Sequence, residues 1–161
     1  LVPFDCSQRA ECALPTAVAL AQANNALLLL TSVIQKPVLP VPDVHAEELS
    51  ELANRFVELS REVVNTRLVE LRSHLAVNSQ IRVIESASIT QTLLDLVELE
   101  DIDLVVFCAH GQSGQVAWPY GSVVSTYIDY GNQPVLVIQD MPPELAHPTQ
   151  AEIAAEKYGS R

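Results

Sequence analysis

The stretch Leu104-Val105-Val106-Phe107-Cys108-Ala109-His110-Gly111 is an apolar run of strand length that ends in small residues and a histidine. An unbroken apolar run is typical of a strand covered on both faces, as in parallel sheets. Four further strands are predicted at residues 1–4, 26–34, 80–85 and 134–138, and helices at residues 9–24, 44–76, 88–98 and 123–130. Because strands alternate with helices, we expect an α/β fold in which a parallel sheet lies between two layers of helices.

Polar residues mark the expected helix ends. Ser7 or Gln8 is expected to cap the first helix, Asp43 the second and Ser88 the third. The pair Asn24-Asn25 is expected to end the first helix, because asparagine tolerates the left-handed conformation of a C-cap.

The second helix is unusually long and amphipathic. Its apolar residues recur every three or four positions and then continue after a shift of one: Leu49, Leu52, Phe56, Leu59, Val63, then Val64, Leu68, Leu71 and Leu75. This spacing predicts one helix packed on the sheet; a coiled-coil partner helix is the alternative.

The charge balance excludes some classes of partner. The chain has 20 acidic and 9 basic residues, a net charge of −11, and only two lysines, Lys36 and Lys157. A basic face for nucleic acid or for an anionic membrane is therefore not expected. The longest apolar run, Ala26–Leu30, is far below the roughly 20 residues that span a bilayer, and no signal peptide is visible. Three cysteines without disulfide-scaffold spacing favour the reducing cytoplasm.

The length of 161 residues predicts one domain, which we place at residues 1–140. Prolines and a weak helical pattern predict a C-terminal tail at residues 141–161 that is mobile or docks on a partner. Because the chain begins with Leu1 inside a predicted strand, we expect a further segment upstream, such as disordered residues, a tag or a similar tandem domain.

The predicted ligand site lies at the carboxyl ends of the strands. In an open α/β sheet of order 3-2-1-4-5, strand order reverses between the first and fourth strands, and ligands bind at such a reversal. Asp5 suits a ribose hydroxyl or a base, while the backbone at Gly111 and the helix start at Gly121-Ser122 suit phosphate oxygens. The alternative is that the glycines serve tight turns and Ser122 only caps a helix.

These residues carry a family resemblance. The stretch from 108 to 122 resembles the G-2x-G-9x-G-[ST] motif of the universal stress proteins. It consists of Cys108-Ala109-His110-Gly111, then nine residues, then Gly121-Ser122. The opening strand with Asp5-Cys6-Ser7 and the closing stretch 133–138 also resemble that family. The resemblance covers residues 1–139 in a consistent order.

The resemblance implies a Rossmann-like fold of the adenine nucleotide alpha hydrolase type, with three layers and a five-stranded parallel sheet of order 3-2-1-4-5. It further implies a stress-response role, ATP or AMP as ligand, with Mg²⁺, and a homodimer paired through the fifth strands. An apolar edge strand at Pro134–Ile138 independently favours such pairing. The implied nucleotide-binding residues are Asp5, Ser7, Val33, Phe107, Cys108, His110, Gly111, Gly121, Ser122 and Val123. No catalytic or metal-binding residue is predicted.

The chain departs from the motif at two positions. Cys108 replaces the first glycine, and its side chain is expected to intrude where backbone usually approaches the ligand. Gln112 stands where members often carry a cation, and no Lys or Arg lies between Ala109 and Ser122. Phosphate would then depend on backbone dipoles, Arg9 or Mg²⁺. Since no Walker A lysine is present either, we expect a sensor or regulator with at most slow ATP hydrolysis.

Two alternatives remain open at this point. One is a dimeric interaction module whose pocket has degenerated and binds no nucleotide. The other is a thiol pair or soft-metal site formed by Cys6 and Cys108, expected on neighbouring strands, with His110 and Cys12 nearby.

Overall fold

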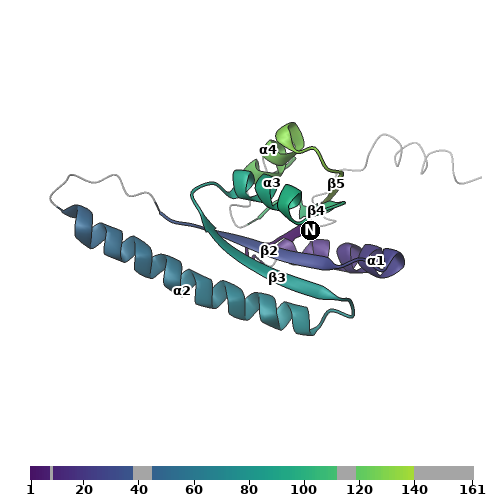
Figure 1. Cartoon of the computed structure of the whole chain (residues 1–161), viewed down its shortest axis with the longest axis horizontal. Coiled ribbons are helices and arrows are strands. Elements are labelled where there is room, and N and C mark those ends of the chain that lie inside the picture. Colours follow the sequence, from purple (N-terminus) through teal and green to yellow (C-terminus); the bar gives the residue numbers. More distant parts are fainter. Residues whose placement is uncertain (8, 38–44, 112–118, 140–161) are drawn as a thin grey trace, which may run out of the picture.

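The computed structural model describes residues 1–7, 9–37, 45–111 and 119–139. Strands and helices alternate along it (Figure 1). The elements are β1 (Val2–Pro3), the 3₁₀ helix η1 (Ala10–Ala13), α1 (Leu14–Asn24), β2 (Leu28–Gln35), α2 (Ala46–Ser73), β3 (Ser79–Ser86), α3 (Ile89–Leu99), β4 (Val105–Cys108), α4 (Ser122–Tyr130) and β5 (Val135–Ile138). The α/β class expected from the sequence is confirmed. The expected tail at 141–161 and the expected cap Asp43 lie outside the described residues.

All strand pairs are parallel, but they form two sheets rather than the single five-stranded sheet that we expected. One sheet has the order β1-β2-β3 and the other pairs β4 with β5. The break lies beside β1, which has only two residues and is too short to continue a ladder. Leu1 nevertheless bridges it, since its carbonyl accepts from the Val106 N–H at 2.9 Å and its amino group donates to the Leu104 carbonyl at 2.8 Å.

Alternate residues of the strands belong to two hydrophobic cores. Leu30 and Val106 belong to the core that contains the buried residues of η1 and α1 and Leu68 of α2. Their neighbours Leu29 and Val105 belong to the other, which contains those of α3 and α4. In Figure 1, α2 accordingly lies on one side of the strands and α3 and α4 lie on the other. This arrangement gives the three layers predicted from the apolar runs.

Several predicted helix ends are confirmed. Asn25 takes the left-handed conformation, with φ 50°, directly after α1. The Ser88 hydroxyl accepts from the Gln91 N–H at 3.3 Å and so caps α3. Ser7 is not the N-cap that we expected: its hydroxyl accepts from the Ala10 N–H at 3.2 Å, but the first turn is a 3₁₀ helix whose N-cap is Arg9, and α1 begins after Ala13.

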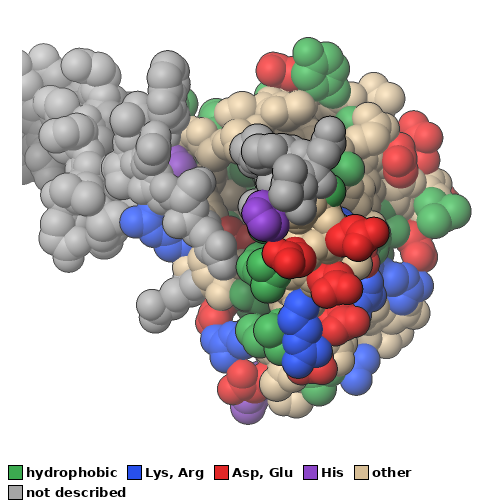
Figure 2. All heavy atoms as spheres, turned by 90° about the vertical axis from the view of Figure 1, so that its left-hand side faces the viewer, with side chains coloured by type: hydrophobic (Ala, Val, Ile, Leu, Met, Phe, Trp, Pro, Cys, Tyr) green, Lys and Arg blue, Asp and Glu red, His purple; other side chains and the backbone are tan. Residues whose placement is uncertain are grey.

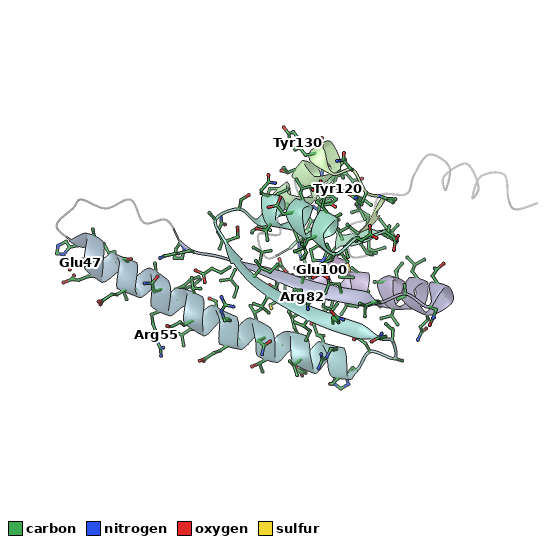
Figure 3. All side chains as sticks on the ribbon, in the orientation of Figure 1. Glu47, Arg55, Arg82, Glu100, Tyr120 and Tyr130 are labelled. Atoms are coloured by element: carbon green, nitrogen blue, oxygen red, sulfur yellow. The ribbon has the colours of Figure 1, made fainter. Side chains whose placement is uncertain are left out.

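Ion pairs join helices to the layers beside them. Arg67 of α2 pairs with Glu11 of η1. Arg82 of β3 pairs at 3.1 Å with Glu100, which follows α3 (Figure 3). This pair ties the end of α3 to β3. No helix within the described ranges is both long and apolar enough to cross a membrane.

Candidate functional site

A cavity of about 320 Å³ opens at the carboxyl ends of β1, β2 and β4, next to the N-terminus of α4. Nine of the ten residues singled out from the sequence line it: Asp5, Val33, Phe107, Cys108, His110, Gly111, Gly121, Ser122 and Val123. The tenth, Ser7, does not. The fold thus gathers residues that lie more than 100 positions apart in the sequence.

Ser7 supports the cavity indirectly, through the turn that carries Asp5. The Ser7 N–H donates to Asp5 Oδ1 at 3.0 Å. Between them Cys6 takes the left-handed conformation, with φ 64°. This turn holds the exposed Asp5 carboxylate at the rim, so Ser7 acts as a positioning residue rather than as part of the wall.

Gly111 is glycine for a reason that the structure supplies. A β-carbon at this position would overlap Asp5 Oδ2 and lie 3.1 Å from Asp5 Cγ. The carboxylate therefore occupies the space that any other residue at 111 would fill.

Gly121 differs in this respect. A β-carbon here would meet its nearest neighbour, the Ala109 carbonyl oxygen, at 3.5 Å, which is ordinary van der Waals contact. Within the described part of the chain, packing does not demand a glycine at 121. Gly121 therefore leaves free space beside it at the wall of the cavity.

The N-terminus of α4 faces the same cavity. Gly121 is its N-cap and donates its own N–H to the Ala109 carbonyl at 2.7 Å, which fixes the start of the helix. The first N–H groups of a helix have no partner within the helix, and together with the helix dipole they favour an anion. Ser122, Val123 and Val124, which supply these groups, all line the cavity.

The opposite wall is apolar. It is built from Val33 of β2, Phe107 of β4, and Ile89 and Leu93 of α3. Tyr127 of α4 backs this wall, with its ring centroid 5.1 Å from that of Phe107 and the rings inclined at 59°. Such a wall suits a flat heteroaromatic ring rather than a charged group.

Sequence reasoning missed Thr31. It is fully buried in β2 and lines the cavity, and its hydroxyl is one of two buried side-chain groups without a hydrogen-bond partner among the described residues. A buried hydroxyl without a partner is costly, so a ligand that bonds to it would recover that cost. The available signal was a polar residue within the apolar run that forms β2.

The cysteines are arranged differently from the expectation. Cys12 Sγ, not that of Cys6, lies 3.1 Å from Cys108 Sγ. Cys108 belongs to the core cluster on the α1 and α2 side. Its sulfur is thus directed at Cys12, and this does not support the expectation that it intrudes on the ligand.

The Cys6 thiol is poorly suited to bind a metal or act as a nucleophile. Burial, and next the Asp5 carboxylate, raise its pKa, while Arg67 partly opposes them. A raised pKa favours the neutral thiol, and the thiolate is the form that reacts and ligates. The described residues contain no group of three or more His, Cys, Asp or Glu side chains that could hold a metal ion.

Charge in the cavity is sparse. Asp5 is the only acidic residue among the described ones that line it, and no Lys or Arg does, Arg9 included. His110 lines it and is buried. The described site can therefore hold a modest negative charge through backbone dipoles but offers no cation to a highly charged phosphate chain.

Comparisons with known proteins agree with the fold. The family model described as the universal stress protein family matches residues 1–139. The structure of the universal stress protein UspA from Lactobacillus plantarum is 26% identical, with a TM-score of 0.67, and the match covers 85% of this chain and 94% of that one. No curated protein sequence matches the chain.

Several of the similar solved structures contain an adenine nucleotide. An Arabidopsis thaliana universal stress protein family protein with AMP bound is 14% identical, with a TM-score of 0.59 and coverage of 92% of this chain and 94% of that one. The Archaeoglobus fulgidus universal stress protein in complex with dAMP is 16% identical, with a TM-score of 0.51 and coverage of 84% and 93%. At these identities the likeness concerns the fold.

Proposed function

Because this chain belongs to the universal stress protein family, we propose that it is a regulatory domain of the stress response that binds an adenine nucleotide in the cavity between Asp5 and α4. One observation carries the proposal: the same cavity has an apolar wall and the N-terminus of α4 in its lining. Similar proteins bind AMP and dAMP, which supports the choice of adenine.

The parts of the cavity match the parts of a nucleotide. The adenine ring would lie against Val33 and Phe107, within reach of the Thr31 hydroxyl. Asp5 would accept from ribose hydroxyls, as a carboxylate at the rim is suited to do. The phosphate would lie against Gly121 and the first amides of α4.

The charge of the site favours a monophosphate. Neutral amides stabilise one phosphate group well, but a triphosphate carries more charge than helix dipoles alone offset. Neither the described lining nor the sequence from 109 to 122 contains a Lys or Arg. We therefore expect AMP to bind more tightly than ATP without metal, and Mg²⁺ to improve ATP binding. Hydrolysis would be slow at most, in keeping with a sensor.

Isothermal titration calorimetry of the full chain tests this proposal. We would titrate AMP, cAMP, and ATP with and without Mg²⁺, and use GMP as the control for base recognition. Saturable binding of an adenine nucleotide, absent in Gly121→Trp, would support the proposal. No heat and no thermal shift at millimolar ligand would refute it and favour the interaction module with a degenerate pocket.

Finer features of the family enter the proposal as well. We infer that the Leu1 bridge makes the five strands act as one sheet of order 3-2-1-4-5, which puts the cavity at the reversal of strand order.

We also infer one domain at residues 1–140, a cytoplasmic setting, and a homodimer, or a tandem pair, formed along the edge of β5. Light scattering that gives the 17.6 kDa monomer mass would contradict the homodimer.

A second function is favoured by the contact between two thiols. Cys12 and Cys108 bring their sulfurs to 3.1 Å, which suits a reversible disulfide better than a metal site. Hydrogen peroxide would supply the oxidant: the two thiols lose two protons and two electrons, an S–S bond forms, and the peroxide takes up these protons and electrons to give two waters. Peptide mapping after peroxide treatment should find Cys12 joined to Cys108 in Cys6→Ser. Three thiols still titratable after treatment of the unchanged chain would exclude this function.

A further inference from the structure

Helix α2 is longer than the strands that it covers. It has 28 residues, whereas β2 and β3 have 8 each. At about 1.5 Å per helical residue and about 3.3 Å per strand residue, the helix spans roughly 42 Å against roughly 26 Å. Figure 1 shows its N-terminal end extending past the ends of both strands. The first turns of α2 therefore extend beyond the sheet.

Between residues 52 and 63, α2 carries on its solvent face an exposed apolar row that we call the outer seam: Leu52, Phe56, Leu59 and Val63. These side chains are 62%, 53%, 46% and 66% exposed, respectively. Ala53 and Val57, by contrast, are buried. The helix thus has one apolar face toward the fold and another toward solvent.

The spacing of the outer seam is that of a coiled coil. Its members follow one another at intervals of four, three and four residues. This is the heptad pattern in which alternate a and d positions face a partner helix. Charged side chains surround the green apolar ones on this end of the molecule in Figure 2, as on the border of an interface.

We propose that the outer seam pairs with the outer seam of a second copy of this chain, as an antiparallel two-helix interface. In that arrangement Phe56 of each copy packs beside Leu59 of the other, and Leu52 beside Val63. The seam is therefore complementary to itself under a two-fold axis, as a symmetric dimer requires.

The charged residues beside the seam favour a second copy of the chain as the partner and an antiparallel orientation of the two helices. With Phe56 as an a position, Arg55 and Glu62 occupy successive g positions, which flank the seam. An antiparallel pair sets Arg55 of each copy beside Glu62 of the other, so two opposite-charge pairs form. A parallel pair would set Arg55 beside the uncharged Ser60, and Glu62 beside Arg67. The Arg67 guanidinium is already paired with Glu11 and Glu70 within the fold. Arg55 points away from the strands in Figure 3, and both side chains are exposed.

The interface is small. A standard stable interface buries about 800 Å² on each partner, and four apolar residues with two flanking charges fall short of that. We therefore expect association that depends on protein concentration. The outer seam is separate from the edge of β5. Pairing of two seams would therefore join two monomers or, if dimers already form through β5, join two dimers into a tetramer.

Charge exchange between full-length variants tests the proposal. Arg55→Glu alone would set two glutamates side by side in each flanking pair, and Glu62→Arg alone would set two arginines side by side. Each variant should therefore associate about tenfold more weakly than the unchanged chain. When the two variants are mixed, one flanking pair joins two native residues and the other joins the two substituted ones. Both pairs then have opposite charges but one has them reversed, so association should return. Sedimentation equilibrium measures each case.

Controls keep this test independent of folding and of other interfaces. Leu99→Glu changes an exposed leucine on α3, outside the seam, and should leave association unchanged. The double variant Phe56→Glu/Leu59→Glu should abolish this step while circular dichroism stays the same. If the mixture associates as weakly as each variant alone, the proposed antiparallel pairing is wrong. The seam would then be unoccupied, or would bind the C-terminal segment or another protein instead.

Discussion

The Asp5 carboxylate lies against the α-carbon of Gly111, in the space that a β-carbon there would occupy. The obstructing atom is the end of a side chain, so Gly111→Ala is expected to turn the carboxylate aside rather than move the backbone. Stability should change by no more than about 1 kcal/mol. If Asp5 bonds to the ribose, AMP affinity should fall about tenfold, the scale of a hydrogen bond to a charged group. Calorimetry and thermal unfolding measure the two effects.

Asp5→Asn is the companion variant, because it keeps the shape of the side chain and removes its charge. Both variants should weaken AMP binding while the fold is kept. Unchanged affinity in both would show that this carboxylate does not contact the nucleotide.

Much of this site could be predicted from the sequence because backbone features leave local signals. Gly121-Ser122 before an apolar helix, and Gly111 after a buried strand, indicate where amides are exposed. Thr31 could not be identified in this way. Whether a threonine in a buried strand finds a partner depends on what packs against that strand, and periodicity does not show it.

Thr31→Val tests the unpartnered hydroxyl. Because the change removes a buried polar group without altering shape, stability should stay the same or rise by up to about 1 kcal/mol. AMP affinity should nevertheless fall about fivefold if the hydroxyl bonds to the ligand. Ser32→Ala is the matched control, since Ser32 is the next residue of β2, also buried, and does not line the cavity. A stability loss without loss of affinity would assign Thr31 to the fold alone.

Gly121→Ala distinguishes the effect of this residue on the stability of α4 from its effect on ligand binding. The new methyl group fits beside the Ala109 carbonyl, so stability should fall by no more than about 1 kcal/mol, the cost of a poorer N-cap. Affinity for AMP should fall tenfold or more if phosphate lies against this residue. Ser88→Ala removes the cap of α3 at a similar stability cost and should leave AMP affinity unchanged. Equal affinities in the two variants would contradict a phosphate site at α4.

The order of the strands and the cysteine pair show a second limit of sequence reasoning. The apolar runs predicted five strands, but not that only Val2 and Pro3 of the first would join a ladder. Cys6 and Cys108 were expected together because each ends a neighbouring strand. The 3₁₀ turn at Ala10–Ala13 places Cys12 there instead, and such a turn leaves no apolar periodicity.

The reactivity of Cys6 should depend on Asp5. Burial and the Asp5 carboxylate raise the thiol pKa, so alkylation of Cys6 should reach its half-maximal rate at a higher pH than alkylation of a model thiol. In Asp5→Asn the electrostatic part disappears, and the midpoint should move to lower pH but stay above that of the model thiol. The pKa of the Cys6 thiol is higher in the folded chain than in the unfolded chain, so the folded thiol keeps its proton to a higher pH. The contribution of this thiol to stability is therefore complete below the unfolded pKa and is lost as the pH rises through the folded pKa. Rates measured in Cys12→Ser/Cys108→Ser from about pH 7 to about pH 10.5 isolate Cys6. A midpoint that Asp5→Asn leaves in place would remove Asp5 as a cause of the shift.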